Sequence, residues 1–177
     1  EYENTILREY LKKNPNNNLD LPLFYECLKS YQKSNDIATP SEDEIVIHLR
    51  LGDVVEVPWF DPAQARYLGI LNQKIARIVE STSISKITIV TCFAYQVWSP
   101  ESIHLKPTGV PEYTYTEDKQ KKNIDTMSGI FDFLSSNFDQ DIQVHSSEKP
   151  DNDLVYCSFA KYFIGDFRDR KSTRLNS

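Results

Sequence analysis

Apolar residues recur at helical spacing in two stretches near the start of the chain. The first covers residues 2–13, and the run at 14–18 ends it because Asn and Pro favour turns. The second begins at Pro22, which fits the first position of a helix, and it continues for about three turns. The polar stretch that follows contains a proline and is typical of a linker. The pattern predicts a helical N-terminal segment and linker over residues 1–43.

A near-continuous apolar run begins at Glu44. Most residues at 45–51 are Ile, Val or Leu, as expected for a parallel strand buried on both faces. Asp61, Pro62 and Gln64 then fit the start of a helix, with Asp61 as the N-cap and Gln64 completing a capping box. This helix carries one apolar stripe and ends near a Ser-Thr-Ser sequence.

Strands and helices continue to alternate along the rest of the chain. We expect strands at 86–92, 142–145 and from Tyr162, a helix around 127–138, and a last helix that Asp153 caps and that runs through Ala160. The irregular, proline-containing stretch at 93–123 is expected to be a solvated surface insertion, with a mobile lid or an acceptor loop as alternatives. The repeated order of strand and helix implies right-handed crossovers. The predicted fold class is α/β, a Rossmann-like parallel sheet flanked by helices.

Composition narrows the functions that are possible. The chain has 177 residues, a formal charge of −6, 40% hydrophobic and 26% charged residues, which suits one folded domain. The acidic balance argues against a general nucleic-acid binder, and no apolar run approaches the ~20 residues that cross a bilayer. Three cysteines and three histidines are scattered, so we expect neither a disulfide framework nor a protein-bound metal. Dinucleotide-binding and P-loop glycine motifs are absent from the sequence.

The clearest chemical signal lies where the first predicted strand ends. Alternate residues of a strand share a face, so His48 and Arg50 are expected side by side at the carboxyl end, where ligands of parallel sheets bind. The planar guanidinium of Arg50 can hold a phosphate bidentately without a metal. Taken singly, His48 could be a structural histidine and Arg50 could pair with Asp53 or Asp61. Taken together with Gly52, the pattern His-x-Arg-x-Gly-Asp favours a binding function.

This motif resembles one in the fucosyltransferase superfamily of GT-B glycosyltransferases, which carry it after a strand of the nucleotide-sugar domain. The downstream sequence is also similar to that family's short strand, acidic helix start and apolar strand, at residues 142–145, 153–158 and 162–165. The resemblance covers about residues 44–165, and its specificity lies mainly in the first motif. The sequence departs from the family at Gly165, because the family's Gly/Ser-rich turn is replaced there.

The resemblance implies a role for each residue of the motif. Arg50 would contact the β-phosphate of GDP-fucose and stabilise the charge that builds on the leaving GDP. His48 and Asp53 would hold Arg50 or the ribose-phosphate, and Gly52 would let the backbone approach the phosphate closely. The implied reaction transfers L-fucose from GDP-fucose to a glycan or protein hydroxyl with inversion. GDP-fucose is the donor substrate, and no cofactor is expected.

Other candidate residues carry a weaker signal. Ser146, Ser147 and Asp153 could line the nucleotide pocket. A general base would assist the acceptor hydroxyl, and Glu56 and Asp61 are the nearest carboxylates after the motif. Acids near a turn are usually solvated, so neither is assigned this role.

Three segments are expected along the chain. Residues 1–43 form the helical segment, 44–168 form a nucleotide-sugar-binding domain truncated at its C-terminus, and 169–177 resemble a translated sequencing adapter. GT-B enzymes have two domains with the active site between them. The expected partners are therefore the donor, a glycan or glycoprotein acceptor, and an N-terminal acceptor domain of the same parent chain.

A second interpretation stays open at this stage. The chain could be a non-catalytic α/β module that binds a phosphorylated ligand or a protein partner. It would then bind through Arg50 without transferring sugar. Even if the parent is an enzyme, the fragment itself could be inactive. The sequence indicates no cellular compartment.

Overall fold

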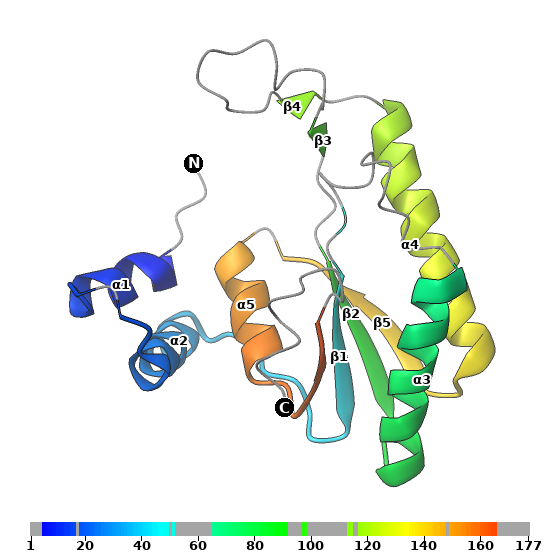
Figure 1. Ribbon diagram of the computed structural model, residues 1–177, viewed down its shortest axis with the longest axis horizontal. Helices are drawn as coiled ribbons and strands as arrows, with labels where there is room; N and C mark the ends of the chain where they lie inside the picture. Colours follow the sequence, from blue (N-terminus) through cyan, green and yellow to red (C-terminus); the bar gives the residue numbers. More distant parts are fainter. Residues whose placement is uncertain are drawn as a thin grey trace.

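The computed structural model describes residues 5–16, 18–49, 51, 65–91, 97–98, 113–114, 117–147 and 149–165. Four parallel strands form the main sheet in the order β5-β2-β1-β6 (Figure 1). Their bounds are β1 Glu44–Leu49, β2 Lys86–Thr91, β5 Asp141–His145 and β6 Tyr162–Ile164. The short strands β3 (Val97–Trp98) and β4 (Tyr113–Thr114) pair with each other in an antiparallel manner. The prediction of an α/β fold with a parallel sheet is confirmed.

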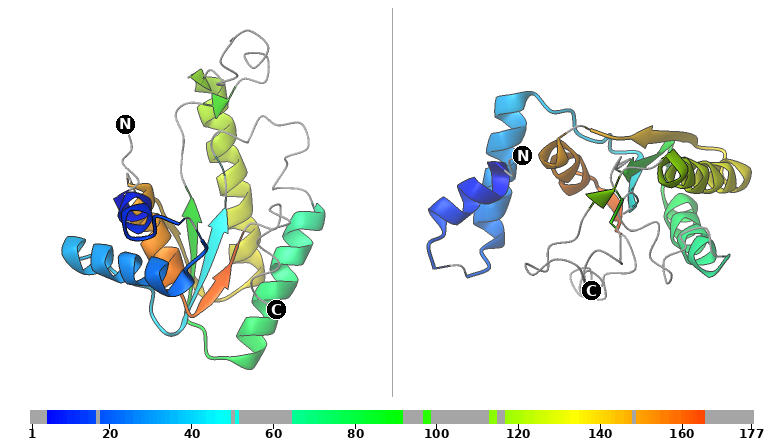
Figure 2. Two further views of the ribbon diagram at one scale, coloured as in Figure 1. Left: turned by 60° about the vertical axis from the view of Figure 1, so that its left-hand side comes forward. Right: turned by 90° about the horizontal axis from the view of Figure 1, so that it is seen from above.

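Helices cover both faces of the main sheet (Figure 2). The helices α3 (Ala65–Ser81) and α4 (Glu117–Asn137) pack on one face, and α5 (Pro150–Ser158) packs on the other. The helices α1 (Thr5–Lys13) and α2 (Leu21–Asn35) lie outside α5. The chain runs outward from β1 through β2 to β5, and then returns across the other face to place β6 on the free side of β1. The strand order therefore reverses at β1, as in doubly wound sheets.

Alternation along β1 separates two cores. Ile45, Ile47 and Leu49 face α3 and α4, where they join the largest buried cluster. Val46 faces α5 and packs with Val90 and Tyr156. Burial on both faces explains why the β1 sequence is an apolar run rather than an alternating one.

A third cluster joins the N-terminal helices to α5. Its buried members come from three helices and are Ile6, Tyr10, Cys27, Leu28 and Val155. Asp151, in the first turn of α5, accepts hydrogen bonds from the backbone N–H groups of Thr5 at 2.7 Å and Ile6 at 3.3 Å. A carboxylate at a helix start satisfies free N–H groups and complements the helix dipole. Asp151 therefore caps α1 from a distant part of the chain.

Two predicted element boundaries are wrong. The stretch 93–123 is not irregular throughout, because α4 begins at Glu117 and β3 and β4 lie earlier in it. The start of α4 carries little apolar periodicity, because Glu117, Asp118, Lys121 and Lys122 are charged and exposed. Asp153 does not cap the last helix, which begins at Pro150 after the N-cap Lys149 and ends at Ser158. Proline is well suited to the first helical position, and this signal was missed.

Candidate functional site

His48 is the penultimate residue of β1. Its side chain is exposed, whereas those of its neighbours Ile47 and Leu49 are buried. His48 therefore projects on the opposite face from Leu49, as the alternation predicted. The rest of the motif (Arg50, Gly52 and Asp53), and also Glu56 and Asp61, lie outside the described residues. The pairing of His48 with Arg50 stays a prediction.

Strand register places a second histidine in the same row as His48. His48 is opposite Val90 of β2, and Val90 is opposite His145 of β5. Register partners in adjacent parallel strands project on the same face, and two strand spacings amount to about 10 Å. His48 and His145 therefore lie on the α5 side of the carboxyl edge, with Val90 between them. The histidines look scattered along the sequence, because strand order cannot be read from spacing.

His145 contacts a carboxylate from α5. Its Nε2 lies 3.3 Å from Oδ1 of Asp153, an ion pair when the imidazole is protonated, although the angle is not that of a hydrogen bond. The backbone N–H of Ser147 donates to the same Oδ1 at 3.2 Å. Burial raises the pKa of Asp153, while His145 and the Ser147 N–H oppose that shift. The cluster therefore holds a half-buried carboxylate beside an imidazole.

Tyr156 of α5 packs against this cluster through His145. Its ring stacks on His145, with 4.5 Å between centroids and an interplanar angle of 10°. Its hydroxyl donates to Oε1 of Glu44 at 2.6 Å. Burial, together with the hydrogen bond to Glu44, raises the pKa of Tyr156 well above its usual range. Tyr156 thus stays neutral and links the carboxyl edge of the sheet to the start of β1.

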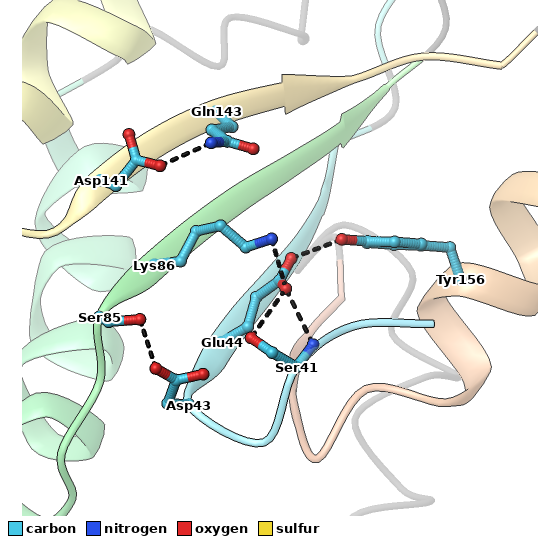
Figure 3. A network of polar contacts seen from close by, with 8 residues as sticks. All are labelled: Ser41, Asp43, Glu44, Ser85, Lys86, Asp141, Gln143 and Tyr156. Carbon is cyan, nitrogen blue, oxygen red and sulfur yellow. Dashed lines mark hydrogen bonds and ion pairs between the residues drawn. The ribbon is translucent and has the colours of Figure 1, made fainter. Parts of the chain in front are cut away.

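Glu44 is fully buried at the amino end of β1 (Figure 3). Its Oε2 lies 2.8 Å from Lys86 Nζ and accepts the backbone N–H of Ser41 at 3.1 Å. Burial raises the pKa of Glu44, but its contacts with Lys86, Thr88, Tyr156 and Ser41 outweigh burial and lower it overall. This network is at the opposite end of β1 from the motif, and every oxygen has a partner. The network therefore stabilises the fold and is not a ligand-binding site.

The three downstream residues predicted to line a nucleotide pocket lie together at the end of β5. Ser146 is exposed, and Ser147 is partly buried. The Ser147 hydroxyl accepts from the N–H of Lys149 at 3.0 Å and donates to its carbonyl at 3.1 Å, so it is engaged in the turn. Asp153 carries negative charge when ionised, which suits hydroxyl or N–H donors of a ligand and not a phosphate. β2 separates this group from the motif on β1.

The carboxyl edge can thus offer two kinds of chemistry. His48 provides an exposed imidazole on β1, and Arg50 is expected to add a cation there. Asp153 provides an acceptor beside β5, supported by His145 and Tyr156. Sequence reasoning named neither His145 nor Tyr156 as a site residue. The available signal was that His48 lies near the carboxyl end of one predicted strand and His145 ends another, which becomes meaningful only once those strands are placed in one sheet.

Within the described ranges, no group of three or more His, Cys, Asp or Glu side chains is arranged to hold a metal ion. None of the helices in that part of the chain is long and apolar enough to cross a membrane. Comparisons with protein-family models, curated proteins and solved structures found no match to this chain.

Proposed function

We propose that this chain is the donor-binding domain of a metal-independent, fucosyltransferase-like glycosyltransferase. It would bind GDP-fucose and transfer L-fucose with inversion to a glycan or protein hydroxyl. The observation that supports this most strongly is the position of the His-x-Arg-x-Gly-Asp motif. It begins on the last residues of β1, the strand at which the order of the sheet reverses. Doubly wound sheets bind ligands at the carboxyl ends of the strands at such a point.

In this proposal Arg50 holds the diphosphate and stabilises the negative charge that develops on the leaving GDP. His48, exposed on the same edge, supports Arg50 or contacts the ribose-phosphate. A guanidinium fork can neutralise a diphosphate by paired hydrogen bonds, so this mechanism needs no metal. The acceptor would bind between this domain and a second domain of the parent chain, as in the family that the motif resembles.

Asp153 serves the nucleoside part of the donor in this proposal. Its carboxylate lies on the same side of the sheet as His48, two strands away. The separation of about 10 Å is one that a nucleoside diphosphate can span. Ribose hydroxyls and the N–H groups of guanine are donors that a carboxylate accepts. The diphosphate would thus lie near β1 and the nucleoside near β5.

Calorimetric titration with GDP and GMP tests this proposal. We expect GDP to bind more tightly than GMP, and Arg50→Gln to weaken GDP binding by at least about tenfold, because a charged, bidentate contact is lost. Arg77→Gln, which removes an exposed arginine from α3, is the matched control and should leave affinity unchanged. Equal GDP affinity in wild type and Arg50→Gln would refute the assignment of Arg50.

Sugar transfer separates the enzyme from a non-catalytic binding module. A parent chain that includes the acceptor domain should release GDP from GDP-fucose in the presence of acceptor, and Arg50→Gln should abolish that release. GDP binding through Arg50 without any release of GDP would favour the binding module.

A further inference from the structure

The contacts of His145 suggest a role that the motif alone does not supply. Tyr156 packs against one face of the imidazole, and Asp153 lies at its edge. The side chain of His145 is 36% exposed, and that of Asp153 is 16% exposed. The imidazole is therefore held in one orientation while part of it remains open to solvent.

The two contacts made by the Asp153 carboxylate engage the same oxygen. Within the described residues, Oδ1 meets both His145 Nε2 and the Ser147 N–H, and Oδ2 has no hydrogen-bond partner. A carboxylate fixed through one oxygen presents the other in a defined direction. Oδ2 is thus the acceptor that remains for a ligand.

We propose that His145 is a positioning residue of the donor site, which orients Asp153 so that Oδ2 accepts a hydrogen bond from the nucleoside, and which does so most strongly when its imidazole is protonated. This inference rests on the proposed function. A protonated imidazole attracts the carboxylate, and it also offsets the negative charge that an anionic nucleotide would meet. Histidine is the side chain that ordinarily changes charge between pH 5 and 8.

Two titratable neighbours of His145 on α5, Tyr156 and Cys157, have pKa values that burial raises above their usual range. Tyr156 is bonded to Glu44, and its pKa is raised by burial. Cys157 follows it on α5, and burial raises the pKa of its thiol to about 12. β2 contributes only Val90 to this row, and the next titratable group along it is His48 on β1. Lys149 is exposed in the turn before α5. His48 is therefore the group whose effect must be separated from that of His145.

The test measures the affinity of the whole chain for GDP at pH 6 and pH 8. The terminal phosphate of GDP also titrates near pH 6, so the comparison between proteins is the informative quantity. We expect the ratio of affinities at pH 6 and pH 8 to be about fivefold larger in wild type than in His145→Gln. His145→Phe keeps a ring against Tyr156 and should behave like His145→Gln. His48→Gln should retain the wild-type difference between the two pH values even if it weakens binding.

A second measurement examines the pair without nucleotide. At pH 6, the change in unfolding temperature of the double variant should differ from the sum of the changes in His145→Gln and Asp153→Asn. At pH 8 this difference should be smaller. Asp139→Asn, in the exposed loop before β5, is the control and should be additive with His145→Gln.

Each result leads to a distinct conclusion. GDP binding with the same pH dependence in wild type and both His145 variants would overturn the role of His145 and leave the proposed function standing. Additive unfolding temperatures would show that the pair is not coupled, and would also overturn it. A folded, coupled pair in a chain that binds no GDP at either pH would overturn the proposed function, and the role of His145 with it.

Discussion

Glu44 shows how a single residue can hold a parallel sheet to the helix above it. Its two carboxylate oxygens contact Lys86 on the adjacent strand and Tyr156 on α5. Removing one partner from a buried charge costs more than an ordinary hydrogen bond, because the charge remains without compensation. The strength of this network therefore depends on keeping every partner.

Tyr156→Phe tests that dependence. The substitution keeps the ring and removes the hydroxyl that bonds Glu44 at 2.6 Å, so we expect a loss of about 2 kcal/mol in the free energy of unfolding. Urea denaturation monitored by circular dichroism measures the loss. Tyr25→Phe removes a hydroxyl from a side chain that is 41% exposed, and it should stay within about 0.5 kcal/mol of wild type. Equal stability of the two variants would contradict the importance of this bond.

Among the elements, α1 depends on a residue far away in the chain. Thr5 and Ile6 donate to Asp151, so the first turn of α1 is stabilised from α5. Asp153, two residues further along α5, belongs to the candidate site. The first turn of α5 thus joins the N-terminal helices to the carboxyl edge of the sheet.

Replacing Asp151 should destabilise α1 more than it destabilises the main sheet. For Asp151→Ala we expect a loss of about 1–2 kcal/mol, because two N–H groups lose their acceptor. Hydrogen exchange followed by mass spectrometry should show faster exchange in α1 than in β1. Asp132→Ala on the exposed side of α4 is the control. Unchanged exchange in α1 would mean that Asp151 does not stabilise this helix.

For the whole molecule, acid unfolding should depend on Glu44. Burial raises the pKa of Glu44, but its polar contacts outweigh burial and hold the folded-state pKa below its ordinary value of about 4.5. Ionised Glu44 therefore stabilises the fold above that pH. This contribution is lost as the pH falls below about 4.5 and through the folded-state pKa. Glu44→Gln should be less stable than wild type at pH 7, and the difference should shrink towards pH 3. Free energies of unfolding from urea titrations at each pH measure it, and a difference that grows on acidification would contradict this account.

The local pattern of residues determined the fold class of this chain. Apolar runs at β1 and β2 and a helical stripe in α3 are properties of short windows, and the alternation of these elements predicts a parallel sheet. It also predicted that His48 and Leu49 project on opposite faces of β1, because strand geometry has a period of two. Where local signals were weak, as in the charged start of α4, the boundaries were wrong.

Only the tertiary structure decided which distant residues meet. The order β5-β2-β1-β6 aligns His145 with His48, although the two are far apart in sequence. The crossover through α5 places Tyr156 on Glu44, Asp153 on His145 and Asp151 on α1. Periodicity within a window specifies which face of an element is buried, whereas lateral strand order depends on packing between separate elements. The candidate motif and Asp153 could therefore be named from the sequence, whereas the contacts that join Asp153 to His145 and His145 to Tyr156 could not.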